Sequence, residues 1–147
     1  MTERFLVEQS RWQPLGSGRM APAGSMADAA LAARLSAYKR HVAGCYHSVA
    51  PGDITTALPA GLTTVSEKVD GETWFLHCDD ERATLLSPAG KAITGIPVTE
   101  EAQRICSGWT GLLAGELYAG TAHGRPRVFD LHAALGGGAN AQTERLR

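Results

Sequence analysis

Four short segments rich in β-branched, aromatic and other apolar residues constrain the fold of this chain most strongly. They occupy residues 62–67, 73–78, 83–86 and 112–119. Turn-forming residues separate them, since Asp79 and Asp80 lie between the second and third segments and Gly90 follows the third. Segments this short with turns this tight favour neighbouring strands that run in opposite directions. We therefore expect an antiparallel meander.

The clearest helix follows a capping pattern. Ser25 with Asp28 three positions later predicts a helix N-terminus, and the apolar residues that follow recur at helical spacing until Gly44. They are Leu31, Leu35, Tyr38 and Val42. A second, shorter helix is expected from Thr99, as its N-cap, to about Gly108.

The two ends of the chain have weaker patterns. Residues 1–26 are interrupted by glycines and prolines, which predicts a lead-in loop with at most a short strand at residues 5–7. The run Gly16-Ser17-Gly18-Arg19 lacks the ending of a phosphate-binding P-loop and is interpreted as part of this loop. Residues 127–131 predict one more strand, residues 136–138 a glycine link, and residue 139 the opening of a helix.

The length of 147 residues suits a single domain. Within it we distinguish residues 1–61, a lead-in loop and amphipathic helix, from residues 62–147, which carry most of the expected strands. Hydrophobic residues make up 44% and charged residues 20% of the chain, as in ordinary globular proteins. We expect an α+β fold, built on an antiparallel sheet with short flanking helices.

Charge and cysteine content restrict the setting. A net charge of -1 provides no broad cationic surface for phosphate backbones, so any nucleic-acid contact must be local. Glu3, Arg4 and Glu8 interrupt any secretory leader, and no apolar run reaches the length of a membrane span. The three cysteines include no CxxC pair, which is typical of free thiols in a reducing compartment. We expect a cytoplasmic protein without membrane contact.

The tetrapeptide Lys68-Val69-Asp70-Gly71 is the first candidate for chemistry. It places a lysine at the end of an expected strand, directly before a turn, where the amine is exposed. A lysine acts as a nucleophile only when its amine is deprotonated, which burial or neighbouring cations promote by lowering its pKa. Taken alone, the tetrapeptide is also typical of a solvated hairpin turn.

Three further segments follow in a fixed order. Residues 85–90 read Leu-Leu-Ser-Pro-Ala-Gly, residues 113–118 read Leu-Ala-Gly-Glu-Leu-Tyr, and residues 127–131 read Arg-Val-Phe-Asp-Leu. Together with the lysine tetrapeptide, the set resembles the ATP-dependent DNA ligase branch of the covalent nucleotidyltransferases. The matching signatures are the adenylated lysine, a Ser-Arg-x-Gly turn, a strand ending in Gly-Glu-Leu, and an aromatic residue before Asp-Leu. The resemblance covers roughly residues 65–147.

The resemblance implies the catalytic roles. Lys68 would accept AMP from ATP through a phosphoramidate bond, and Asp70 would orient the lysine or its neighbours. Glu67 and Gly71 would lie against the nucleotide. The AMP would then pass to a 5′-phosphate in nicked or broken nucleic acid, with DNA favoured over RNA.

The resemblance also implies the cofactor contacts. Glu116 would bind the nucleotide and help to hold Mg²⁺, an ion that prefers a few carboxylate oxygens with phosphate and water. Phe129 would stack on the adenine, because an aromatic face binds a base at little entropic cost.

Two positions depart from the family pattern. Thr73 stands where many DNA ligases carry an arginine, and Pro88 replaces the arginine of the Ser-Arg turn. We expect Lys91 or Arg82 to supply the missing cationic contact. The departures leave open an RNA ligase of the same superfamily, a GTP-using capping enzyme, or a non-catalytic nucleotide-binding module.

The family's later signatures are missing from the sequence. Lysine occurs only at positions 39, 68 and 91, so the Lys-x-Lys strand that contacts the triphosphate in this family is absent. Residues 62–147 therefore resemble the first half of a nucleotidyltransferase (adenylation) domain that is truncated at its C-terminal end. We expect this chain by itself to adenylate poorly or not at all, because the triphosphate lacks much of its charge compensation.

Overall fold

The computed structural model describes residues 6–41, 47–58, 61, 71–80, 82–118 and 128–134 of the chain. For Lys39, Tyr118 and residues 128–134 it describes the backbone alone. The strands are β1 (Gln13–Leu15), β2 (Gly18–Ala21), β3 (Glu72–Cys78), β4 (Ala83–Leu86), β5 (Ala92–Thr94), β6 (Gly111–Tyr118) and β7 (Val128–Ala134). The helices are α1 (Ala29–His41), α2 (Ile54–Ala57) and α3 (Pro97–Ile105), with short 3₁₀ turns η1 (Gln9–Arg11) and η3 (Pro51–Asp53).

The strands form one open sheet of seven strands in the order β1-β2-β5-β4-β3-β6-β7, and every neighbouring pair is antiparallel. Strands β3, β4 and β5 follow one another as a meander. The chain then passes through α3 and returns as β6 on the other side of β3. The expected α+β class with an antiparallel sheet and short helices is confirmed.

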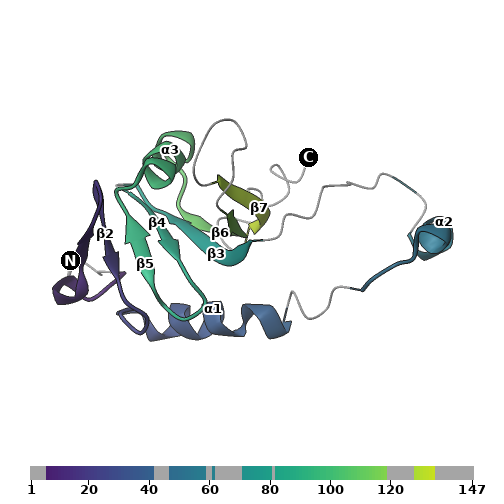
Figure 1. Cartoon of the computed structure of the whole chain (residues 1–147), viewed down its shortest axis with the longest axis horizontal. Helices are drawn as coiled ribbons and strands as arrows, with labels where there is room; N and C mark the ends of the chain where they lie inside the picture. Colours follow the sequence, from purple (N-terminus) through teal and green to yellow (C-terminus); the bar gives the residue numbers. More distant parts are fainter. Residues whose placement is uncertain are drawn as a thin grey trace.

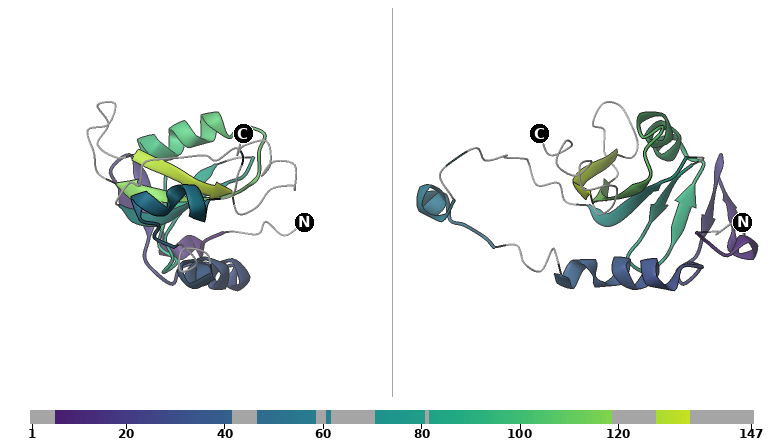
Figure 2. Two further views of the ribbon diagram at one scale, coloured as in Figure 1. Left: turned by 90° about the vertical axis from the view of Figure 1, so that its right-hand side faces the viewer. Right: turned by 180° about the vertical axis from the view of Figure 1, so that it is seen from behind.

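One helix packs on each face of the sheet, and we name the faces after them (Figure 1). The α1 face buries Leu35 and Tyr38 of the helix against Phe75 and Leu86 of the sheet. The α3 face buries Trp74, Leu76, Leu85 and Ile93 beneath Ala102 and Cys106. The end-on view in Figure 2 shows α3 above the sheet and α1 below it. Because alternate residues of a strand point to opposite faces, both faces of β3 lie in the core.

Most of the expected elements are confirmed. Strands at 73–78, 83–86, 112–118 and 128–131 and a helix through Leu31, Leu35 and Tyr38 are present. The cap of α1 is Asp28, whose Oδ1 accepts the Leu31 N–H at 3.0 Å, whereas the Ser25 hydroxyl accepts a hydrogen bond from Arg11.

Helix α3 starts at Pro97, two residues before the expected cap. Thr99 lies inside its first turn, where its hydroxyl accepts the Ile96 N–H at 3.0 Å. Thr99 therefore caps the N-terminus of α3 from the third position of the helix rather than from the N-cap position.

The expectation of an irregular lead-in loop is wrong for residues 13–21. They form the β1–β2 hairpin, in which Gly16 has φ +58°, and β2 joins the sheet beside β5. Gly18 packs against the Gly95 backbone so closely that a Cβ would lie 2.6 Å from the Gly95 carbonyl carbon. Glycine at this position is what allows β2 to reach the sheet.

Residues before and after position 61 share one buried cluster. Val7, Ala21 and Leu35 belong to the same buried cluster as Phe75 and Leu112. The first part of the chain thus completes the α1 face of the sheet.

Several expected elements fall outside the described residues: the strand at 62–67, the glycine link at 136–138 and the helix from 139. Residues 47–58, which include η3 and α2, are exposed and lie apart from the sheet (Figure 1). In the described part of the chain, no helix is long and apolar enough to cross a membrane.

Candidate functional site

Three adjacent strands bring together residues from the segments at 113–118 and 127–131 and the strand that follows Gly71. In the register of the sheet, Thr73 of β3 pairs with Glu116 of β6, and Glu116 pairs with Asp130 of β7. One position along, Leu117 pairs with Phe129. Gly71 lies exposed directly before β3, at the same end of the three strands. We call this end of the sheet, with Gly71, Thr73, Glu116 and the Phe129 backbone, the candidate site.

Glu116 is the carboxylate of the candidate site. It is half-buried on the α1 face, because it alternates along β6 with Ala114 and Leu112, which are buried on that face. The Thr73 hydroxyl donates a hydrogen bond of 3.1 Å to Glu116 Oε1. Since a carboxylate has about four acceptor positions, this bond orients the group and leaves most of its capacity for a ligand.

Thr73, at the position where many DNA ligases carry an arginine, is a hydrogen-bond donor to Glu116. The neutral hydroxyl orients the Glu116 carboxylate without adding a positive charge. Lys68, Glu67 and Asp70 lie outside the described residues, so their predicted roles remain predictions. Of the expected site residues, the structure describes Gly71, Glu116 and the backbone of Phe129.

The expectation that Arg82 or Lys91 replaces the missing arginine is wrong. Arg82 follows the turn at Asp79, which comes directly after Cys78 at the end of β3. Cys78 is five residues along β3 from Thr73, so this end of the strand lies about 17 Å from the candidate site. Lys91 lies on the α3 face, with its ammonium 5.9 Å from the Trp74 ring centroid. Pro88 sits in the tight β4–β5 turn, closed by a Gly90 N–H to Ser87 carbonyl bond of 2.9 Å.

The oxygen atoms of Glu116 could hold a metal ion only if a bound molecule such as a nucleotide supplied further ligands to that ion. Among the described residues, no group of three or more His, Cys, Asp and Glu side chains could hold a metal ion. A single carboxylate is nevertheless compatible with Mg²⁺, which is usually held by one or two carboxylates plus substrate phosphates and water. The described residues therefore fit a metal ion that binds together with the phosphates of a ligand, and Glu116 would be a protein ligand of that ion.

A second polar position, His77, was not predicted as a site from the sequence. His77 lies on the α1 face beside a cavity of about 360 Å³ that Arg34 and Asp28 of the α1 region also line. Its Nδ1 is buried without a hydrogen-bond partner in the described structure. Burial lowers the pKa of His77, and the charge of Asp79 partly opposes this shift. The residue is therefore held in its neutral form.

We expect stability to fall as pH decreases below about 6.5. The folded-state pKa of His77 lies below its unfolded value, so the unfolded chain binds more protons in this range and folding becomes less favourable. One such group contributes at most about 1.4 kcal/mol per pH unit. The check is urea unfolding from pH 7.5 to 5 for the wild type, for His77→Gln, and for the exposed His47→Gln. An unchanged pH dependence in His77→Gln would contradict the assignment.

Comparisons of the chain with protein-family models, with curated proteins and with solved structures return no match. The functional argument therefore depends on the residues and the geometry described above.

Proposed function

We propose that this chain carries the front part of an ATP-dependent polynucleotide ligase site, in which Lys68 accepts AMP. The observation that supports the proposal is that Gly71, Glu116 and the Phe129 backbone lie at one end of the neighbouring strands β3, β6 and β7. Glu116 and its partner Thr73 are 43 positions apart in the sequence. Lys68 is three residues from Gly71, so covalent geometry keeps their Cα atoms within about 11 Å.

The chemistry of the proposal is a nucleotidyl transfer. The neutral Lys68 amine attacks the α-phosphorus of ATP, an N–P bond forms, and the bond to the β-phosphate oxygen breaks. Pyrophosphate leaves, and the amine loses its proton. An oxygen of a nucleic-acid 5′-phosphate then attacks the same phosphorus, and the N–P bond breaks to regenerate the lysine.

The other residues position the nucleotide. Glu116, already oriented by Thr73, would bind the ribose or hold Mg²⁺, which supplies charge compensation to the phosphates when bound. Glu67 and Gly71 would lie against the nucleotide, Asp70 would orient the lysine or its neighbours, and Phe129 would stack on the base. DNA is the favoured nucleic acid, with RNA as the alternative. A cytoplasmic setting is part of the proposal, supported by the free thiols of Cys78 and Cys106.

The test is covalent labelling with ATP. We expect incubation with α-labelled ATP and Mg²⁺ to give a small amount of labelled protein on a denaturing gel, and α-labelled GTP to give less. Glu116→Gln should reduce the labelling at least about tenfold, because it removes the charged ligand from the site. The matched control is Glu100→Gln, an exposed residue of the first turn of α3.

Two outcomes would contradict the proposal. Calorimetric ATP binding without any covalent label would indicate a non-catalytic nucleotide-binding module. Preferential labelling by GTP would indicate a capping-type enzyme instead.

A further inference from the structure

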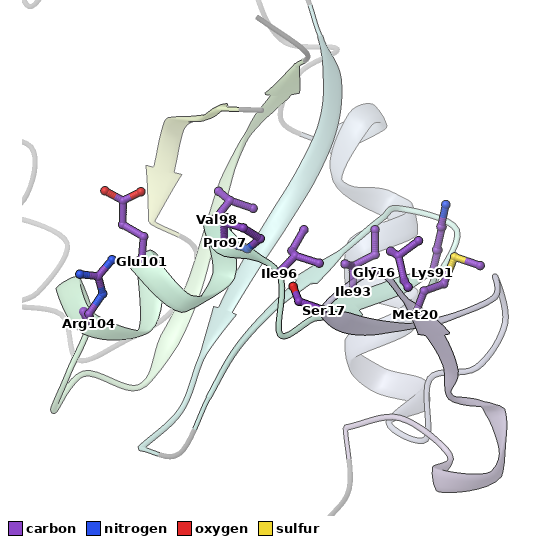
Figure 3. Close-up of a pocket in the computed structure, with 11 residues that line it drawn as sticks. Gly16, Ser17, Met20, Lys91, Ile93, Ile96, Pro97, Val98, Glu101 and Arg104 are labelled. Atoms are coloured by element: carbon purple, nitrogen blue, oxygen red, sulfur yellow. The ribbon is translucent and has the colours of Figure 1, made fainter. Parts of the chain in front are cut away.

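A second cavity opens on the α3 face, away from the candidate site. It has a volume of about 600 Å³ and lies between the β1–β2 hairpin and α3 (Figure 3). Its apolar wall is formed by Leu15, Met20, Ile93, Ile96, Pro97 and Val98. Small-molecule sites are typically cavities of about 300–1,000 Å³ with mostly apolar walls and a few polar groups, so this cavity has the size and lining of such a site.

The walls are held in place by contacts outside the cavity. Ile93 is a buried residue of β5, and the Ser17 hydroxyl donates to the Gly95 carbonyl oxygen at 3.2 Å. Gly18 allows the hairpin to pack directly on Gly95. On the other side, the Thr99 hydroxyl fixes the start of α3 through the Ile96 N–H and carbonyl. The cavity therefore exists before any ligand binds, which lowers the entropic cost of binding.

Charge is distributed unevenly along the cavity. Lys91 lies at one end, and Glu101 and Arg104 lie together at the other (Figure 3). The Lys91 ammonium is 5.9 Å from the Trp74 ring centroid. An aromatic face attracts a cation without neutralising it, so the Lys91 end keeps a full positive charge. At the other end, a carboxylate and a guanidinium offset each other.

We propose that this cavity binds a small amphipathic anion, with an apolar body on Ile93, Ile96 and Val98 and a carboxylate, sulfonate or phosphate group at Lys91. The Lys91 end selects the negative charge, and the apolar wall selects the body. The site is separate from the nucleotide site, because Glu116 faces the opposite side of the sheet. The proposal does not depend on the ligase function.

The test uses 8-anilinonaphthalene-1-sulfonate and its uncharged analogue N-phenyl-1-naphthylamine as probes. We expect fluorescence titration to give one site per chain for each probe. Lys91→Gln should weaken binding of the sulfonate about tenfold and leave the uncharged analogue within about twofold, because a charge-assisted contact is lost only for the anion. The matched control is Lys39→Gln, at a lysine of α1, which should leave the binding of both probes unchanged.

A second variant tests the apolar wall. Val98→Trp should fill the cavity and weaken both probes, whereas Ile105→Trp, at a residue of the same helix that is 74% exposed, should weaken neither. Near-ultraviolet circular dichroism of each variant separates loss of the site from loss of the fold. A variant that fails to fold is replaced by Val98→Phe, which also narrows the cavity.

Four results would overturn the proposal. The first is several equivalent probe sites per chain, and the second is an equal effect of Lys91→Gln on the two probes. The third is displacement of the sulfonate by excess ATP that Glu116→Gln abolishes. The fourth is probe binding that decreases when the chain forms dimers at higher protein concentration. The third result would place the probe in the nucleotide site. The fourth would identify the cavity as an interface between two copies of the chain.

Discussion

Replacing Lys68 by alanine is expected to remove all AMP-labelled protein. Lys68 carries the one side-chain amine in the signature segments, and an amine is the group that forms the lysyl phosphoramidate of the proposed intermediate. Alanine therefore eliminates the bond itself rather than weakening a contact. The measurement is the label retained on a denaturing gel after incubation with α-labelled ATP and Mg²⁺, followed by peptide mass spectrometry to locate the modified residue.

The control is another lysine of the same chain. Lysine occurs only at positions 39, 68 and 91, and Lys39 lies in α1. Lys39→Ala should keep the wild-type labelling. Label that survives in Lys68→Ala, or an adduct that maps to another residue, would refute the lysyl-AMP proposal. Because the amphipathic anion site lies on the other face of the sheet, binding of the naphthalene probes should be unchanged in Lys68→Ala.

The long strands and α1 could be predicted from the sequence because local pattern and tertiary packing agree there. Apolar residues on both faces of β3 mark a strand buried on two sides, and Leu31, Leu35 and Tyr38 recur at the spacing of one helix face. Strand β5 and the β1–β2 hairpin were missed. These strands have only three or four residues each, and β1 contains Pro14 and β2 contains Gly18, which disfavour strands locally. They are stabilised by pairing instead, since β2 pairs with β5 and β5 pairs with β4.

The candidate site was only partly predictable for a related reason. The signatures identified Glu116, but its hydrogen bond to Thr73, 43 positions away, depends on the register between β3 and β6. Register and strand order also decide which face a side chain occupies. This is why Lys91, four residues after Ser87 in the sequence, lies on the opposite face from Glu116. The two cavities depend on packing between distant elements and leave no pattern in the sequence.

Phe75→Ala is expected to cost about 3–5 kcal/mol of the free energy of unfolding, the range for truncation of a buried aromatic residue. Phe75 is 0% exposed at the centre of the α1 face. Its ring meets the Tyr38 ring edge-on, with centroids 5.1 Å apart and planes at 89°, so it also joins α1 to the sheet. Because small domains have about 5–15 kcal/mol of stability in total, this loss is a large fraction of it, and the variant should unfold at a clearly lower urea concentration than the wild type.

Urea unfolding, followed by circular dichroism, measures this loss. Phe75→Leu keeps most of the buried volume and removes the edge-on ring contact, so it should cost clearly less than Phe75→Ala. Ile105→Ala, at a residue that is 74% exposed, should change the free energy of unfolding by no more than about 0.5 kcal/mol. If Phe75→Ala unfolded at the wild-type urea concentration, the α1 face would not be the packed core that joins residues 6–41 to the sheet. Destabilisation through Phe75 should also weaken both naphthalene probes in proportion to the unfolded fraction, since β5 belongs to both sites: Ile93 lines the cavity, and Ala92 lies in the core with Phe75.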